Sequence, residues 1–377
     1  MVDLSVLSDP TLVALDQQMV RDNPPSQRSY FGGSVIGKEC ERQHWYDFRW
    51  VLETVFDAQT LARFHDGHAS EALIAERLKA IPEITLWTEK EKGKQFGYEA
   101  LGGHVRMHLD GVIKGLLQAP ATPHVWEHKC VNERKFRSLK KKKTEFGEKN
   151  ALEQWDGIYF AQAMTYMGQS KLKRHYLTVA TPGSRELTSC RTEFQPEVYE
   201  RLMAKAQRVV FSPTPLEPIS RKPEYFQCRW CTYKENCHGS KVARINCRTC
   251  VHVTPQEDGT WRCEYHNKNL SMKAQRAGCN HHLLIPDLVP FGEVIDMNKE
   301  ANVITYQTDA GTKFSNASTN DWSKNCFTSK DLQHLDGDLL DSETDFFSLM
   351  SRFDGAHIES VIKAKEKPEP VDEELAA

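Results

Sequence analysis

The stretch HVRMHLDGVIKGLLQAPATPHVWEHKC, residues 104–130, decides the fold. Apolar and polar residues alternate from 104 to 113, which predicts a half-buried strand with Asp110 at the end of its polar face. A loop with two prolines follows, and the run 124–130 predicts a second strand. We expect the two strands to be neighbours in one sheet.

Three side chains with complementary chemistry come together if these strands are neighbours. The pleat of the second strand puts Glu127 and Lys129 on one face, and Asp110 lies at the matching end of the first strand. Carboxylates hold a hard divalent cation such as Mg or Mn, and a lysine beside them neutralises charge that builds up on a phosphate. His128 points to the other face, but its backbone carbonyl can also reach such a metal. The sequence therefore predicts a site that hydrolyses phosphodiester bonds.

The helix predicted for 57–81 adds two polar side chains. His68 and Glu71 are three residues apart and share one face of that helix. Glu71 can bind the same metal directly or through water, and His68 can be a ligand or a contact to DNA. Gly67 costs about 1 kcal/mol relative to alanine inside a helix, which favours a close approach of another segment there.

A second predicted helix, 151–167, carries Gln162 and Tyr166 four residues apart, again on one face. These two side chains can orient a sugar-phosphate backbone. The pattern continues with a strand pair joined by a Pro-Gly-Ser turn and with a third helix, at 174–180, 185–194 and 196–211.

Four motifs in order carry a family resemblance: G-H-x-x-E (67–71), D-G (110–111), E-x-K (127–129) and Q-x-x-x-Y (162–166). Over residues 30–240 the chain resembles the RecB-type branch of the PD-(D/E)XK nucleases. It is especially similar to phage recombination exonucleases and to the nuclease of CRISPR adaptation. The resemblance implies that Asp110 and Glu127 bind Mg or Mn and that Lys129 is catalytic. It also implies that Gln162 and Tyr166 aid DNA binding, while the family uses either a histidine or a glutamate in the helix motif.

Simpler interpretations compete with each of these roles. E-x-K occurs by chance in many strands, so Glu127 and Lys129 can be a solvated surface pair. His68 can be an ordinary helix residue, and Gln162 and Tyr166 can lie at the edge of the core. The four motifs, each on its expected element, favour the nuclease hypothesis.

Eleven cysteines are many for a cytosolic protein, and clustered cysteines in a reducing compartment favour metal binding. Cys228, Cys231 and Cys237 form C-x2-C-x5-C, one ligand short of a four-thiolate site. RecB-type nucleases with an iron–sulfur cluster have one cysteine before the nuclease core and three after it. The resemblance therefore implies Cys40 as the fourth ligand of a 4Fe-4S cluster. Zinc, with His238 or a more distant histidine, is the alternative.

A second cysteine group predicts a zinc ribbon-like module. Cys247 and Cys250 form a C-x2-C knuckle, and Cys263 and Cys279 are the expected remaining ligands, with His266 as the competing fourth. Such modules stabilise a small domain that cannot build its own core. Contact with DNA or with a partner protein is an equal alternative to a folding role.

A lysine run follows the second strand of the predicted site. The formal net charge of the chain is −3, so any DNA contact must come from local basic patches. The nearness of the run to the metal site favours phosphate contacts, which make binding depend on salt. A solvated face is the alternative for these residues, Lys140, Lys141, Lys142 and Lys143.

The sequence has no run of about 18 apolar residues, so we expect no membrane helix. The first residues lack a basic segment followed by an apolar one, which argues against a secretory signal. We expect a cytoplasmic protein, in the bacterial host cytosol if a phage encodes it.

The expected fold class is α/β, a restriction-endonuclease-like core with a central mixed sheet flanked by helices, plus a small zinc-binding module. We expect an N-terminal extension, a nuclease domain with the iron–sulfur cysteines, the zinc module and a C-terminal extension with a disordered acidic tail: 1–30, 31–240, 241–295 and 296–377.

The expected activity is a Mg- or Mn-dependent DNA exonuclease in phage or bacterial recombination or DNA end processing. A single-strand annealing protein or another recombination protein is a candidate partner. One alternative is an endonuclease or a CRISPR-adaptation-type trimming nuclease. The other is a catalytically inactive DNA-binding or scaffold protein with structural metal sites.

Overall fold

The computed structural model describes residues 9–25, 27–321, 324–335 and 337–341. The chain forms two compact units. The first comprises Met1–Arg221 and Val253–Met272, and the second comprises Lys222–His252 and Lys273–Ala377. The domain boundaries expected from the sequence stay predictions, and the predicted disordered tail lies outside the described residues.

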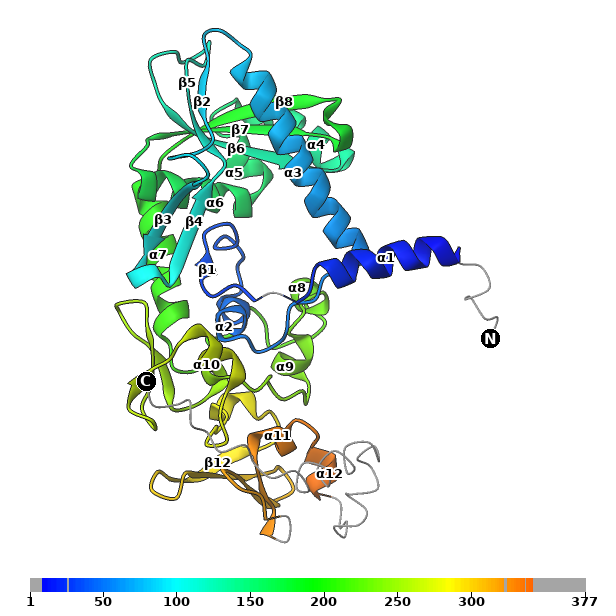
Figure 1. Ribbon diagram of the computed structural model, residues 1–377, viewed down its shortest axis with the longest axis vertical. Coiled ribbons are helices and arrows are strands. Elements are labelled where there is room, and N and C mark those ends of the chain that lie inside the picture. The colour runs from blue at the N-terminus through cyan, green and yellow to red at the C-terminus, as the bar shows by residue number, and fades with distance from the viewer. Residues whose placement is uncertain (1–8, 26, 322–323, 336, 342–377) are drawn as a thin grey trace. The chain divides into compact units, whose positions relative to one another are not determined.

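A five-stranded mixed sheet forms the centre of the first unit, in the order β2-β5-β6-β7-β8 (Figure 1). β6 and β7 run parallel, and the other three pairs are antiparallel. The predicted second strand and the predicted strand pair are confirmed, although the last strand begins two residues late. The strands are Thr85–Trp87 (β2), Gly111–Lys114 (β5), His124–Cys130 (β6), Arg174–Ala180 (β7) and Leu187–Glu193 (β8).

Two helices cover the two faces of this sheet. The helix α3, Ala58–Lys79, confirms the helix predicted for 57–81 and begins after its N-cap Asp57. It packs on the face of β6 that carries Trp126. The helix α6, Gly157–Ser170, reaches the opposite face, where Gln162 bonds the side chain of Glu127. Alternation along β6 therefore turns Trp126 toward α3 and Glu127 toward α6.

The first predicted strand is not continuous. It breaks at Asp110 into β4, Val105–Leu109, and β5, and the two parts belong to different sheets. Gly111 follows the break, and a Cβ there would lie 2.6 Å from the carbonyl oxygen of Trp87, so the close approach of β2 at this point needs glycine. β4 is the middle strand of a three-stranded sheet with Phe31–Gly32 (β1) and Phe96–Ala100 (β3).

One further prediction needs correction, and two helices were not predicted. The helix expected at 151–167 is two helices, α5 (Ala151–Trp155) and α6, because Asp156 is extended and caps α6 by accepting from two backbone N–H groups. The lysine run lies on a helix, α4 (Glu133–Phe146). The N-terminal extension, which has no clear periodicity, forms α1 (Pro10–Asp22) after the N-cap Asp9.

The late segment 253–272 belongs to the first unit. The guanidinium of Arg49 lies 5.1 Å from the ring centroid of Trp45 and 5.2 Å from that of Trp261, so cation–π contacts attach this segment to the unit. The remaining elements are Glu41–Arg49 (α2), Pro196–Phe211 (α7), Val253–Pro255 (β9), Trp261–Cys263 (β10) and Lys268–Asn269 (β11). The helix predicted at 196–211 is thus confirmed.

The second unit contains a four-stranded sheet in the order β12-β13-β14-β15, whose core includes stacked rings of Tyr306 and Phe314 at 5.1 Å. Its strands are Glu293–Asn298, Val303–Gln307, Lys313–Ala317 and Cys326–Phe327. Short helices accompany them: Phe226–Arg229 (α8), Lys234–His238 (α9), Met272–Ala277 (α10), Ser329–Leu332 (α11) and Gly337–Asp341 (α12). Within the described part of the chain, every helix is too short or too polar to cross a membrane.

Candidate active site

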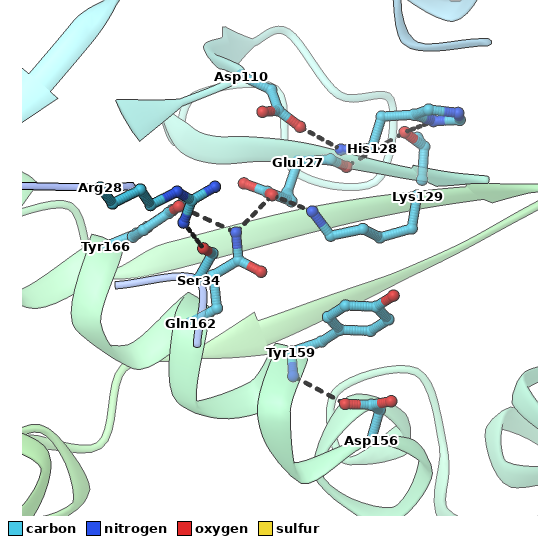
Figure 2. A network of polar contacts seen from close by, with 11 residues as sticks. Arg28, Ser34, Asp110, Glu127, His128, Lys129, Asp156, Tyr159, Gln162 and Tyr166 are labelled. Atoms are coloured by element: carbon cyan, nitrogen blue, oxygen red, sulfur yellow. Dashed lines mark hydrogen bonds and ion pairs between the residues drawn. The ribbon is translucent and has the colours of Figure 1, made fainter. Parts of the chain in front are cut away.

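Glu127 and Lys129 lie one residue apart on the same face of β6, and Lys129 Nζ contacts Glu127 Oε1 (Figure 2). Gln162 Nε2 donates to the same oxygen at 2.7 Å. The other carboxylate oxygen, Oε2, is buried and has no hydrogen-bond partner among the described residues. A buried carboxylate oxygen without a donor favours a cation at that position.

Asp110 lies in the break between β4 and β5, beside the same segment of β6. Its Oδ2 accepts a hydrogen bond of 2.9 Å from the backbone N–H of His128. β5 pairs with β6 through Gly111 and Trp126, so Asp110 and Glu127 are next to each other along the register. The N–H and C=O of one strand residue point to the same side, so the carbonyl of His128 also faces Asp110.

The helix α3 brings Glu71 and His68 to this place. Both side chains line the same cavity as Asp110, and His68 is near enough for its charge to act on the Asp110 carboxylate. Glu71 is half-buried and interacts electrostatically with Asp110 and Lys129. The predicted helix motif therefore reaches the strand motifs.

The electrostatics of the site are dominated by burial of several carboxylates together. Burial, and then the charge of Asp110, raises the pKa of Glu127 to about 8 and that of Glu71 to about 7. Burial also raises the pKa of Asp110. Burial alone would lower the pKa of Lys129, but the carboxylates of Glu127 and Asp110 raise it well above its usual value. The lysine therefore stays charged, and the carboxylates need more positive charge than it supplies.

Gln162 and Tyr166 form the wall on the α6 side. Both are almost fully buried, and Gln162 Nε2 donates to Tyr166 OH at 3.0 Å in addition to its bond to Glu127. Figure 2 shows the two side chains pointing from one helix toward the carboxylate. This geometry supports a role in orienting Glu127, and the predicted DNA contact stays a prediction.

A cavity of about 510 Å³ joins these groups. Gly67 also lines it, but a Cβ there would meet no atom within 4 Å, so the close approach predicted at Gly67 is wrong and the glycine faces open space. The predicted site residues that line the cavity are His68, Glu71, Asp110, Glu127, His128, Lys129, Gln162 and Tyr166.

The rim of the cavity is cationic, which the sequence analysis missed. Arg28, Arg63 and Arg106 line the cavity and are exposed. The guanidinium of Arg106 lies 5.6 Å from the ring centroid of Tyr30. Strand alternation placed Arg106 on the polar face that ends in Asp110, so that signal was present. Arg28 had no such signal, because its segment reaches the site only through the pairing of β1 with β4.

The types of residue at the site fit a hard divalent cation, although their side chains do not form a complete set of ligands in this structure. Across the described ranges, no three His, Cys, Asp or Glu side chains are grouped closely enough to hold a metal as they stand. Glu127 nevertheless interacts electrostatically with both Asp110 and Glu71, and its Oε2 is buried without a donor from the described residues. Carboxylate oxygens with one unsatisfied position are the donor set that Mg²⁺ and Mn²⁺ prefer.

The lysine run lies on α4, away from this cavity lining. Lys143 Nζ donates to the carbonyl of Ser189 at 2.7 Å, and Lys141 and Lys142 form ion pairs with Glu145. Lys140 lies over the ring of Phe136. The residues that line the cavity include none of the four lysines. Their contact with DNA stays a prediction.

The predicted iron–sulfur cysteines fall in both units. Cys40 is the N-cap of α2 in the first unit. Cys228, Cys231 and Cys237 lie in or between α8 and α9 of the second, where Cys231 N donates to Cys228 O at 3.1 Å. Ligation of a cluster or of zinc by these residues stays a prediction.

The predicted zinc cysteines are also divided. Cys247, Cys250 and Cys279 lie in the second unit. Burial, with smaller contributions from the nearby Cys247 and Cys279, raises the pKa of Cys250 to about 12. Cys263 lies in the first unit, where its Sγ accepts from the backbone N–H of His266 at 3.5 Å. Zinc binding and the choice of the fourth ligand stay predictions.

No family model matches the sequence, and no curated protein matches it either. The solved alkaline exonuclease LHK-Exo from Laribacter hongkongensis is similar at 14% identity and a TM-score of 0.35, over 51% of this chain and 90% of that chain. Its complex with dAMP is similar at 11% identity, with the same coverage and TM-score. The protein SSO0001 is similar at 10% identity and a TM-score of 0.33, over 61% of this chain and 96% of that chain. The function proposed below rests on the geometry of the site.

Proposed function

We propose that this chain is a metal-dependent DNA nuclease of the PD-(D/E)XK type, which hydrolyses phosphodiester bonds in the cavity lined by residues of α3, β6 and α6. The observation that carries the proposal is the meeting of Asp110, Glu127 and Lys129 in one buried place, with Glu127 Oε2 left without a donor from the described residues. A structural ion pair with Lys129 needs only one carboxylate, whereas a second buried carboxylate beside the first favours a divalent cation.

The residues divide the chemistry between them. A bound Mg²⁺ or Mn²⁺ supplies a Lewis acid and a more acidic water. Asp110, Glu127 and the carbonyl of His128 would hold it, with Glu71 binding directly or through water. Lys129 stays charged beside Glu127 and is placed to neutralise negative charge on the phosphate as the bond to its leaving oxygen breaks.

The cationic rim of the cavity favours a polyanionic substrate. Arg28, Arg63 and Arg106 surround a centre of carboxylates, so a polyanion can bind at the rim while one phosphate reaches the centre. A guanidinium matches a phosphate with two parallel hydrogen bonds. DNA is the substrate that the resemblance of the motifs implies.

The test is a cleavage assay with Mg²⁺ or Mn²⁺ on labelled single- and double-stranded DNA. The wild-type protein should cut, and E127Q and K129M should lose about 100-fold or more of the rate while still binding DNA. Glu145→Gln, an exposed charge on α4, is the matched control and should cut at the wild-type rate. Unchanged cleavage by E127Q, or no cleavage by the folded wild type with either metal, contradicts the proposal.

We propose an exonuclease that acts in recombination or DNA end processing, because the motif order is similar to that of such enzymes. End-labelled linear DNA against closed circular DNA separates it from an endonuclease or a trimming nuclease, since an exonuclease leaves the circle intact. An inactive scaffold predicts DNA binding without cleavage in every assay. A single-strand annealing protein is the partner to test first, by co-purification with the E127Q variant.

We also propose structural metals for the two cysteine groups, from their spacing. Freshly purified protein with a 4Fe-4S cluster is brown and absorbs near about 400 nm, whereas a zinc site is colourless. Metal analysis of C228S/C231S and of C247S/C250S assigns each metal to its group. If both variants keep the full metal content of the wild type, both assignments are contradicted.

A further inference from the structure

A chain of buried hydrogen bonds lies behind the acidic face of β6, and the proposed chemistry does not use it. Ser70 Oγ lies 2.8 Å from His128 Nε2 and 2.7 Å from Ser184 Oγ. On the other side of the ring, His128 Nδ1 lies 3.0 Å from Thr178 Oγ1. All four side chains are almost fully inaccessible to solvent. Buried hydroxyls in a continuous chain with a histidine favour one fixed arrangement.

The donors and acceptors of this hydrogen-bond chain follow from one another when the Thr178 hydroxyl donates to the main chain. Thr178 Oγ1 accepts from Trp126 Nε1 at 3.1 Å and donates its own hydrogen to the carbonyl of Glu127 at 3.3 Å. His128 Nδ1 must therefore donate to Thr178, which leaves Nε2 of a neutral ring as an acceptor for the Ser70 hydroxyl. Ser184 then donates to Ser70. Every hydroxyl hydrogen is then donated to an acceptor, and the series of hydrogen bonds ends at the backbone carbonyl of Glu127.

Two adjacent members of this hydrogen-bond chain, Ser70 and His128, lie on the two elements that carry the proposed metal ligands. Ser70 is on α3, directly before Glu71 and two residues after His68. His128 is on β6, between Glu127 and Lys129, and its N–H holds Asp110. The bond between Ser70 and His128 therefore joins the helix that carries one carboxylate to the strand that carries another.

We infer that Ser70 and the side chain of His128 are positioning residues, whose hydrogen bond holds the part of α3 that carries Glu71 beside the part of β6 that carries Glu127, so that Glu71 can join Asp110 and Glu127 around a divalent cation. The inference rests on the proposed function, because it concerns the same site. Outer hydrogen bonds of this kind set the orientation of metal ligands, and their loss costs about 10- to 100-fold in metal affinity. Neither residue touches the reacting atoms.

Two substitutions of His128 distinguish the loss of its hydrogen bond to Ser70 from the loss of the ring's volume. In H128N the amide stands near the position of Nδ1, so the bond to Thr178 is kept and the bond to Ser70 is lost. In H128Q the longer side chain reaches the position of Nε2, so the bond to Ser70 is kept. Both variants remove the ring, and they differ in the bond that joins α3 to β6.

The experiment measures Mn²⁺ binding to metal-free full-length protein without DNA, by the electron paramagnetic resonance signal of free Mn²⁺. S70A and H128N should bind Mn²⁺ about 10- to 100-fold more weakly than wild type, and H128Q should bind close to wild type. Ser329→Ala is the matched control, because it breaks another buried serine–histidine bond, to His282 Nδ1 at 2.9 Å, in the second unit. It should leave Mn²⁺ affinity unchanged.

Folded S70A or H128N with wild-type affinity overturns the inference. If neither folds by circular dichroism, Thr178→Val takes their place, since it removes the bonds to His128 and to the Glu127 carbonyl with little change of shape. It should weaken Mn²⁺ binding, and wild-type affinity overturns the inference there too. E127A reports separately on the proposed function: if it binds Mn²⁺ as tightly as wild type, the metal site itself is wrong, whatever the other variants do.

Discussion

Nε2 of Gln162, on α6, donates a hydrogen bond of 2.7 Å to Oε1 of Glu127, on β6. The same nitrogen donates to Tyr166 OH at 3.0 Å, so both amide hydrogens are used inside the site. Oε1 therefore receives donors from Gln162 and Lys129, and Oε2 is left for a cation. A neutral donor fixes the carboxylate without removing its charge, which is what a metal ligand needs.

Gln162→Leu should lower the cleavage rate at saturating Mg²⁺ by about 10-fold or more, because Glu127 then rotates away from its ligand position. It should also lower the free energy of unfolding by about 1–3 kcal/mol, since a buried oxygen loses one donor. Single-turnover cleavage and urea unfolding measure the two effects. Tyr166→Phe keeps the bond from Gln162 to Glu127 and should cost clearly less of the rate. Equal losses in both variants contradict the role given to Gln162.

Gly111→Ala should destabilise the protein by about 1–3 kcal/mol in urea unfolding, because overpacking against backbone is not relieved by side-chain motion. The added Cβ would lie 2.6 Å from the carbonyl oxygen of Trp87. Gly67→Ala is the matched control, since the same change in α3 meets open space. It should raise stability by up to about 1 kcal/mol. A stable Gly111→Ala protein means that β2 does not approach the break at Asp110 as described.

Much of this site follows from sequence because its groups lie on regular elements. The pleat of β6 places Glu127 and Lys129 on one face of that strand, and helical spacing places Gln162 and Tyr166 on one face of α6. The break at Asp110 does not follow, because alternation continues through it and gives no sign that the chain changes sheets. The close approach of Gly111 to Trp87 just after the break is a tertiary contact, which local alternation does not predict.

The cationic rim is another feature that depends on tertiary packing and is only partly predictable from the sequence. Arg28 comes from a segment with no polar pattern that points to a site, and tertiary packing alone brings it to the cavity. Arg63 lies on α3, whose polar residues His68 and Glu71 were assigned to the site, but its own contribution was missed. The lysine run was conspicuous in the sequence, yet three of its members have ordinary partners on α4 and β8. Local charge density predicts a basic surface but does not predict which surface faces the substrate.

DNA binding should therefore depend more on the rim than on α4. Arg63→Ala, made in the E127Q variant so that DNA is not cut, should weaken binding and lower the slope of log K against log salt by about one, as for one lost phosphate contact. Lys141→Ala in the same variant is the comparison. Fluorescence anisotropy over a salt series measures both. An unchanged slope for Arg63→Ala together with a lower slope for Lys141→Ala would assign the contact to the lysine run instead.

Stability should fall in mild acid through His44, a buried histidine of α2. Burial, and then the charge of Lys205, lowers its pKa to about 3. Its Nε2 donates to the carbonyl of Lys38 at 3.1 Å, and its ring packs 4.8 Å from that of Phe31, so the folded protein has no place for a second proton. In the unfolded chain the pKa returns to about 6.5. Below that value the unfolded state takes up a proton that the folded state does not, so the stabilising contribution is complete above pH 6.5 and decreases as the pH falls toward about 3.

Between pH 6.5 and pH 5 this one group should remove about 2 kcal/mol from the free energy of unfolding. His44→Gln keeps a donor for Lys38 and cannot titrate, so its loss over the same interval should be smaller by that amount. Urea unfolding of both proteins at pH 7, 6 and 5 gives the comparison, in which the titration of all other groups cancels. Parallel curves for wild type and His44→Gln would show that His44 takes up its proton in the folded protein as well, and that its surroundings are less closed than described.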